Sequence, residues 1–262
     1  MSDLTLRPGY PAGKGEGARH QAWVRVPETR SRRLAAALAR AWLGLRYRHL
    51  SRRYRSLVLE VVDGVPLVIL PQVFNPVLLR SGALMARALS RLPLHDAVDM
   101  SVLDLGTGSG IGAVFAARRG AKVVAVDINP DAVRCARINA LLNDADARIE
   151  VRLGDLFEPV RGQTFDLIVF NPPFYRGLPR DNLEHAWRGK DVFERFAAGL
   201  DAMLAPDGHA LLTLSTDGDC AELLADLGAA GFRTNLVEEA DLINEVISIY
   251  LVRRGKIASP TL

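Results

Sequence analysis

The chain has 262 residues and a formal net charge of +3; 49% of the residues are hydrophobic and 24% are charged. This composition suits one folded domain, or one domain with an extension, and argues against a wholly disordered chain. No apolar run approaches the ~20 residues of a membrane span, and residues 1–17 lack the apolar centre of a signal peptide, so we expect a cytoplasmic protein that does not bind membranes.

The first element is a basic segment. Residues 25–55 contain ten arginines and one acidic residue, Glu28. Residues 31–50 have a helical pattern, with an apolar stripe of Leu34, Leu38, Trp42 and Leu45. Two interpretations stay open. The arginines either contact a polyanion such as RNA, or they form the solvated face of a helix that packs on the main domain. We place the boundary of this basic arm and helix after residue 55.

The main domain, residues 56–262, begins with a predicted hairpin. Two apolar runs over residues 56–71 flank Asp63-Gly64, which suits a tight type I′ turn. A helix is predicted over Val77–Leu92. From residue 101 strands and helices alternate, which indicates a parallel sheet covered on both faces. The last two predicted strands have no helix between them and predict an antiparallel end to the sheet. The seven predicted strands are 101–106, 122–127, 148–155, 165–171, 209–215, 232–239 and 245–254.

The two cysteines, Cys135 and Cys220, lack CxxC spacing and have no His cluster nearby. Cys135 falls in a helical pattern, where we expect a small buried thiol. We therefore predict no metal site.

A glycine-rich loop follows the first strand of the alternating part. In such sheets ligands bind beyond the carboxyl ends of the strands, and a helix that follows a glycine loop offers free N–H groups. The third glycine of a nicotinamide fingerprint is replaced by Ile111. The GxGxG spacing, with an acid two residues before it, suits S-adenosylmethionine (SAM), which has an ammonium group and no pyrophosphate. We predict close contact at the glycines and a contact of Asp104 with the ammonium, directly or through water. The cofactor residues predicted here are Asp104, Gly106, Thr107, Gly108 and Gly110.

Two acids at the next strand ends sharpen this prediction. Asp127 ends the second strand, where a carboxylate can bridge both ribose hydroxyls; as a helix cap it is less suited than Asn129. Asp155 follows the third strand, where it can accept a hydrogen bond from the adenine amine, although by itself it also suits a turn. Ile128 and Leu156 are placed to sandwich the adenine ring. Together these features favour SAM over NAD.

The fourth strand ends in Asn171-Pro172-Pro173-Phe174. Proline ends a strand because it cannot donate to the ladder, but the same tetrapeptide also suits chemistry. The Asn171 side-chain oxygen and the Pro172 carbonyl can accept hydrogen bonds from an NH2 group and hold its lone pair toward a methyl donor. The prolines keep these acceptors free and rigid, and Phe174 offers a stacking face. These four residues are the predicted catalytic residues.

With these motifs the chain resembles class I SAM-dependent methyltransferases that carry an NPP(Y/F) motif, and in particular the HemK-like group that methylates a glutamine amide in translation release factors. The resemblance covers roughly residues 57–254 and includes "VFNP", "DLGTGSG", "VDINPDAV" and "VFNPPF". It implies a Rossmann-like sheet of seven strands, mostly parallel, with an antiparallel strand near its end. It also implies that Asp127 binds the ribose, that Asp155 and Leu156 bind the adenine, and that Asn171 with Pro172 binds the target nitrogen.

Three functions follow. The favoured one is methylation of a protein glutamine-type amide. The second is the same chemistry on an adenine or guanine amine of RNA or on a small molecule, because the family motif has Tyr for glutamine methylation where this chain has Phe174. The third is a nucleic-acid-binding module without catalysis. Glutamine methylation requires a protein as substrate, and methylation of a nucleic-acid amine would use RNA. We therefore expect a macromolecular substrate.

Overall fold

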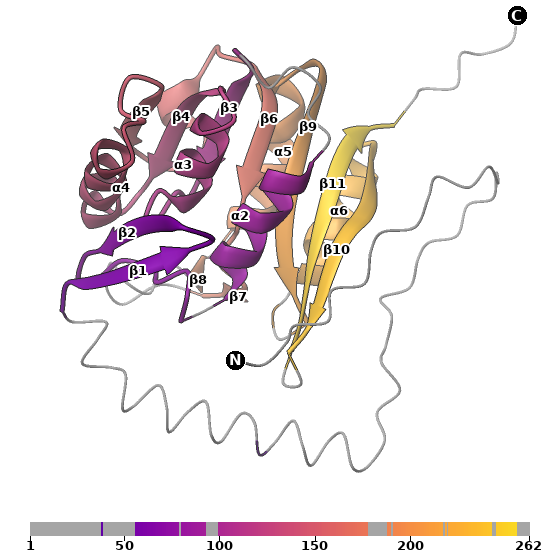
Figure 1. Ribbon diagram of the computed structural model, residues 1–262. Helices are drawn as coiled ribbons and strands as arrows, with labels where there is room; N and C mark the ends of the chain where they lie inside the picture. The colour runs from indigo at the N-terminus through magenta and orange to yellow at the C-terminus, as the bar shows by residue number, and fades with distance from the viewer. Residues whose placement is uncertain are drawn as a thin grey trace, which may run out of the picture.

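A mostly parallel sheet of seven strands forms the centre of the protein in the computed structural model (Figure 1). The structure describes residues 38, 56–78, 80–92, 99–177, 188–189, 191–216, 218, 220–242 and 245–255, so nearly all of the basic segment lies outside the described residues. The strands are β3 (Ser101–Leu105), β4 (Lys122–Asp127), β5 (Ile149–Leu153), β6 (Phe165–Phe170), β9 (Leu204–Ser215), β10 (Phe232–Asp241) and β11 (Val246–Arg254).

The strand order across this sheet is β10-β11-β9-β6-β3-β4-β5. The strands β5, β4, β3, β6 and β9 pair in parallel, whereas β11 runs antiparallel to both of its neighbours, β9 and β10. This confirms the predicted α/β class and the antiparallel end of the sheet. β3 lies next to both β4 and β6, so the chain changes direction across the sheet at β3, and ligands bind at such a switch point.

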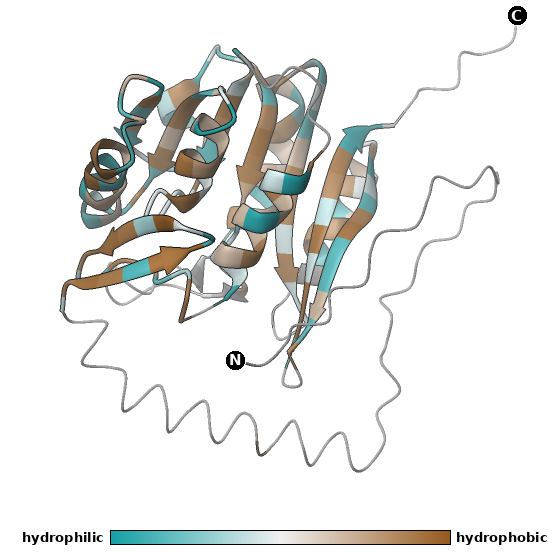
Figure 2. Ribbon diagram, viewed as in Figure 1, coloured by the Kyte–Doolittle hydropathy of each residue, from teal (hydrophilic) through white to brown (hydrophobic). Residues whose placement is uncertain are grey.

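Helices cover both faces of the sheet. One core cluster joins one face to α2 (Ser81–Arg91), α3 (Ile111–Ala117) and α4 (Pro130–Leu142). A second cluster joins the other face to α5 (Val192–Met203) and α6 (Cys220–Ala229), which lie behind the sheet in Figure 1. Figure 2 shows apolar residues along most of the length of the central strands, as expected where both faces of a strand are buried.

The predicted hairpin is present as β1 (Val58–Val62) and β2 (Val65–Ile69), a separate two-stranded sheet. Asp63 and Gly64 have φ angles of 47° and 80°, as the predicted turn requires. A buried side chain of α4 attaches the hairpin to this helix. Asn139 accepts a hydrogen bond from the amide of Val68 and donates one to the carbonyl of Val68, both at 2.7 Å.

Helix α2 begins at Ser81, four residues after the predicted start at Val77. Asn75 accounts for the difference because its side-chain oxygen accepts hydrogen bonds from the amides of Val77 and Leu78. This local turn competes with a helical conformation. Arg80, directly before the helix, has a φ of 64°, so the backbone enters α2 from the left-handed region.

Three short elements were not predicted: η2 (Glu158–Val160), β7 (Tyr175–Arg176) and β8 (Arg188–Gly189). β9 also begins at Leu204, five residues before its predicted start at residue 209. No helix in the described part of the chain is both long and apolar enough to cross a membrane.

Candidate functional site

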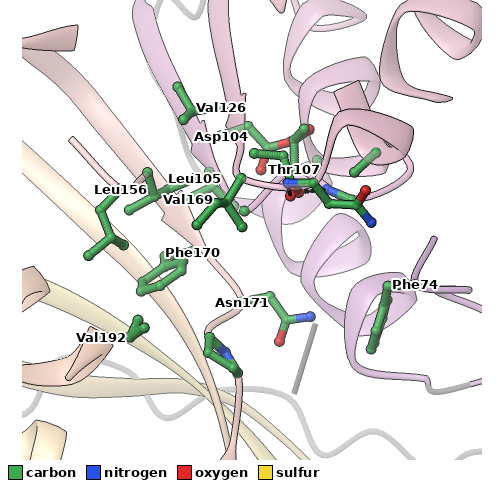
Figure 3. Close-up of a pocket in the computed structure, with 18 of the residues that line it drawn as sticks. Phe74, Asp104, Leu105, Thr107, Val126, Leu156, Val169, Phe170, Asn171 and Val192 are labelled. Carbon is green, nitrogen blue, oxygen red and sulfur yellow. Dashed lines mark hydrogen bonds between the residues drawn. The ribbon is translucent and has the colours of Figure 1, made fainter. Parts of the chain in front are cut away.

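A cavity of about 300 Å³ lies at the carboxyl edge of the parallel strands. Part of its wall comes from the segments that follow β3, β4, β5 and β6, the four strand ends from which a site was predicted, and the rest includes residues in and before α2 and α5. Ten of the thirteen predicted site residues line it: Asp104, Gly106, Thr107, Gly108, Asp127, Ile128, Asp155, Leu156, Asn171 and Pro173. Figure 3 shows the part of this cavity between the end of β6 and the loop after β3.

The glycine loop after β3 has a backbone that favours glycine. Gly106 and Gly108 have φ angles of 63° and 54°, in the left-handed region. A Cβ atom at Gly106 would lie 3.6 Å from the ring of Phe170, and one at Gly108 would lie 3.8 Å from Cβ of Phe74. Side chains here would therefore strain the loop and occupy cavity space next to both aromatic residues.

Asp104 lies beneath the glycine loop, 5% exposed. Its Oδ2 accepts hydrogen bonds from the Thr107 hydroxyl at 2.6 Å and from the amide of Ala113 at 2.8 Å (the Thr107 bond is drawn in Figure 3). Burial raises the pKa of the Asp104 carboxyl to about 6, although both hydrogen bonds lower it; the nearby Asp127 carboxyl also raises it slightly. Asp104 thus holds the loop together and places a titratable group at the cavity.

Asp127 connects the ends of β3 and β4. Its Oδ2 accepts a hydrogen bond from the amide of Gly108 at 2.8 Å, and its Oδ1 accepts one from the amide of Asn129 at 2.9 Å. The cap of α4 is Asn129, whose side chain accepts from the amide of Asp131. The expectation that Asn129, rather than Asp127, caps this helix is confirmed, and Asp127 lines the cavity.

Asp155, the predicted adenine contact, forms an ion pair with Arg195 of α5. Arg195 Nη1 lies 2.7 Å from Asp155 Oδ2 and its Nη2 lies 3.3 Å from Oδ1. Arg195 also pairs with Asp191 at 3.0 Å. Leu156 beside it has a φ of 47°, an uncommon conformation for a leucine. Arg195 therefore links the loop after β5 to α5 and fixes the orientation of the carboxylate at this end of the cavity.

The NPPF tetrapeptide begins where the β6 ladder ends. Phe170 is the last residue of β6 that pairs with β3 and β9, so Asn171 lies just beyond the sheet. The Nδ2 atom of Asn171 donates a hydrogen bond to the Ser81 hydroxyl at 3.2 Å. Its Oδ1 atom is buried and has no hydrogen-bond partner among the described residues. An unsatisfied buried acceptor is costly, and a donor from a bound molecule would satisfy this one.

Three predicted site residues do not line the cavity: Gly110, Pro172 and Phe174. Gly110 has a φ of 82° and lies against α4, where a Cβ atom would be 2.9 Å from Cα of Ala136. Its role here is close packing of two helices. The side chain of Phe174 packs against the core cluster on the α5 and α6 face of the sheet. This arrangement gives no support to the predicted stacking role of Phe174.

Several cavity residues were not predicted as site residues. Phe74 belongs to the "VFNP" string that contributed to the family resemblance, so a sequence signal for it existed. Arg195 also lines the cavity and pairs with Asp155, 40 residues away, whereas Ser81 is not a lining residue but contacts Asn171, 90 residues away; no local pattern marks either of them. No group of three side chains suited to a metal ion occurs in the described part of the chain.

Comparison with known proteins agrees with this geometry. The methyltransferase small domain family matches residues 69–229. A Methanocaldococcus jannaschii protein provisionally named as a protein N5-glutamine methyltransferase is 30% identical over 184 residues, which cover 67% of this chain and 88% of that protein. A tRNA1(Val) (adenine(37)-N6)-methyltransferase of Phocaeicola vulgatus is 32% identical over 134 residues, 48% of this chain and 56% of that protein.

Among solved structures, the 16S rRNA N2 G1207 methyltransferase of T. thermophilus, in complex with AdoMet (SAM) and guanosine, superposes with a TM-score of 0.56. It is 24% identical, and the match covers 76% of this chain and 50% of that one. This likeness shows the fold. The family match and the relatives, together with the cavity at the ends of β3 to β6, establish that the chain belongs to the methyltransferase small domain family and is a SAM-dependent class I methyltransferase.

Proposed function

We propose that this enzyme transfers a methyl group to the side-chain amide nitrogen of a glutamine in a protein. The observation that carries the proposal is the Asn171 amide, whose buried Oδ1 has no partner among the described residues and lies at the end of β6 beside the glycine loop. The M. jannaschii relative, of which this chain covers 88%, supports a glutamine as the acceptor.

In this proposal SAM supplies an electrophilic methyl group on its sulfonium. The residues of this chain bind and orient the cofactor and the acceptor. Gly106 and Gly108 let the cofactor approach the backbone, Asp127 accepts from the ribose hydroxyls, and Asp155 accepts from the adenine amine. The cavity fits this assignment because these residues line it together and because the two glycines leave space where a side chain would intrude.

Asn171 acts on the acceptor. An amide nitrogen is a poor nucleophile because its lone pair is delocalised into the carbonyl. A hydrogen bond from the acceptor's NH2 group to Asn171 Oδ1 would fix the nitrogen with its lone pair toward the methyl group, whereas Pro172, whose carbonyl was also predicted to bind this group, does not line the cavity. No base has to remove a proton before transfer: the N–CH3 bond would form as the S–CH3 bond breaks, a neutral thioether would leave, and the surplus proton on the nitrogen would pass to water afterwards. Positioning therefore carries much of the catalysis, and proximity can supply up to ~7–11 kcal/mol of barrier reduction.

An adenine or guanine amine of RNA is the second candidate acceptor, because it presents the same planar NH2 group. The P. vulgatus relative acts on a tRNA adenine, and Phe174 replaces the Tyr that is usual for glutamine methylation. The glutamine is favoured because the relative that supports it matches more of both chains.

The test supplies purified enzyme and tritiated SAM to a cell extract from the source organism, then separates protein, RNA and small molecules. We expect label in protein, at a glutamine side chain, that resists ribonuclease and is lost with protease. The matched control is Asn171→Ala, which should reduce the labelling rate by roughly 10²–10³ while SAM binding persists. Label confined to RNA would replace the glutamine proposal with the RNA one, and undiminished labelling by Asn171→Ala would remove Asn171 from the acceptor site.

A further inference from the structure

The side chain of Asn171 has two different ends, and only one of them can serve the proposed chemistry. Its Oδ1 atom accepts hydrogen bonds, whereas its Nδ2 atom only donates. Rotation of the amide by half a turn would exchange these atoms with almost no change in shape. A donor aimed at the acceptor's NH2 group would repel it, so something must fix the orientation of the amide.

A serine hydroxyl can accept from Nδ2 or donate to Oδ1 of an amide, and in the structure the Ser81 hydroxyl accepts from Asn171 Nδ2. Asn171 Nδ2 donates to Ser81 Oγ at 3.2 Å, which leaves Oδ1 without a partner among the described residues. Figure 3 shows the Asn171 nitrogen turned toward the side of the cavity where Phe74 lies. The contact joins the end of β6 to the first residue of α2, elements 90 residues apart in the chain.

The position of Ser81 is itself fixed. Its side chain is 1% exposed. Arg80, directly before it, has a φ of 64° and forms an ion pair with Glu245 at 3.2 Å. Glu245 in turn accepts a hydrogen bond from the hydroxyl of Ser215, at the end of β9, at 2.6 Å. The ion pair of Arg80 and the hydrogen bond of Glu245 thus connect the turn before Ser81 to the end of β9. A residue that positions another must itself be fixed in this way.

We propose that Ser81 is a positioning residue for methyl transfer, because its hydroxyl accepts from Nδ2 and holds the Asn171 amide with Oδ1 unpaired among the described residues. The inference rests on the proposed function, since it needs Asn171 to bind the acceptor. It adds a residue outside the NPPF motif to the machinery. In this proposal the first residue of α2 positions Asn171 and does not bind the cofactor.

The test compares Ser81→Thr with Ser81→Val, two side chains of nearly the same shape that differ in the hydroxyl. Both are measured with tritiated SAM and the same cell extract at saturating SAM. We expect Ser81→Thr to keep most of the maximal rate and Ser81→Val to lose roughly 3- to 10-fold relative to Ser81→Thr, the effect of one neutral hydrogen bond. In a separate series in which SAM is varied, the KM for SAM should be the same in both variants, because the contact acts on the acceptor.

A double-mutant comparison separates this inference from the proposed function. In an Asn171→Ala background, Ser81→Val should cause no further loss, because the amide that it orients is gone. If Asn171→Ala is severely impaired while Ser81→Val equals Ser81→Thr, the positioning role is wrong and the proposed function stands. If Asn171→Ala is itself unimpaired, the proposed function fails first.

Ser81 is tightly packed, so folding is checked independently of activity. Calorimetric titration with S-adenosylhomocysteine counts the binding-competent molecules in each preparation, and rates are expressed per competent molecule. Ser81→Ala, which is smaller than serine, is the second variant without a hydroxyl and should show the same loss in rate. A wild-type rate per competent molecule in Ser81→Ala would overturn the inference even if Ser81→Val did not fold.

Discussion

At the residue scale, the site residues that could be predicted are those that directly follow a recognisable strand in the sequence. The glycine loop and the acids at the ends of β4 and β5 each follow a recognisable strand, and all of them line one cavity. The unpredictable part consists of partners that tertiary contacts bring in. Ser81 and Arg195 determine how Asn171 and Asp155 are held, yet each lies on a helix whose sequence reveals only that it is amphipathic.

The buried carboxyl of Asp104 leads to a prediction about pH. Its pKa in the folded protein is about 6, above its ordinary value of 3.8, so the folded protein holds this proton more tightly than the unfolded chain does. The contribution of Asp104 to stability is therefore fully present below about pH 4 and is lost as the pH rises to about 6. Relative to wild type, Asp104→Asn without cofactor should gain stability over this interval and then level off. Thermal unfolding from pH 4 to pH 8 measures the difference.

The same carboxyl makes cofactor affinity depend on pH. We predicted that Asp104 contacts the ammonium group of SAM; such a contact favours the ionised carboxyl, so affinity in the wild type should increase as the pH rises through about 6. In Asp104→Asn this increase should be absent. Parallel curves for the two proteins, measured by calorimetry, would show that Asp104 does not face the ammonium.

At the element scale, the order of strands and helices followed from the sequence because the apolar periods are long and the turn residues are specific. The first residues of α2 and β9 were not predicted correctly from the sequence. α2 starts later than its apolar pattern suggests because the side chain of Asn75 binds the backbone that the first helical turn would use. β7 and β8 have two residues each, too few for a period to show.

The attachment of the β1–β2 hairpin to the domain leads to a stability prediction. Asn139 of α4 is fully buried, and its side chain bonds both to Val68 in β2 and to the carbonyl of Ser109, next to the glycine loop, at 2.8 Å. Asn139→Ala would remove these hydrogen bonds, leaving the carbonyl of Val68 with the Cys135 thiol as a donor at 3.2 Å, and should lower the free energy of unfolding by about 1–3 kcal/mol.

The control is Asn143→Ala, one turn further along α4. Asn143 also donates to the hairpin, through the carbonyl of Pro66 at 2.9 Å, but in an exposed position where water can replace the bond. Its loss should therefore cost less than that of Asn139. Urea unfolding of both variants measures the two effects, and equal losses would mean that burial does not determine the strength of this attachment.

At the scale of the whole molecule, SAM should stabilise the enzyme and NAD should not. A ligand at 100 times its dissociation constant adds about 2.7 kcal/mol to the free energy of unfolding. A thermal-shift measurement with SAM, S-adenosylhomocysteine and NAD tests this. Asp127→Ala should reduce the shift with SAM, because the carboxylate that we assign to the ribose also holds the amide of Gly108. A shift with NAD alone would contradict the cofactor assignment.

The basic segment, residues 25–55, lies outside the described residues apart from Leu38, so both interpretations of its arginines stay open.

At the other end of the domain, the order of the strands has a consequence for how the enzyme is made. β11 follows β9 and β10 in the chain, yet it lies between them in the sheet.

In the described sheet β10 pairs only with β11, so β10 cannot join before β11 has paired with β9. A growing chain that has reached β10 therefore presents β9 as an open edge, and open edges pair readily with other chains. The sheet is completed when β11 pairs with the open edge of β9 and holds β10 on its other side. Translation that stalled or ended before Val246 would leave the cavity-lining strands β3 to β6 already made, next to a sheet edge that invites aggregation.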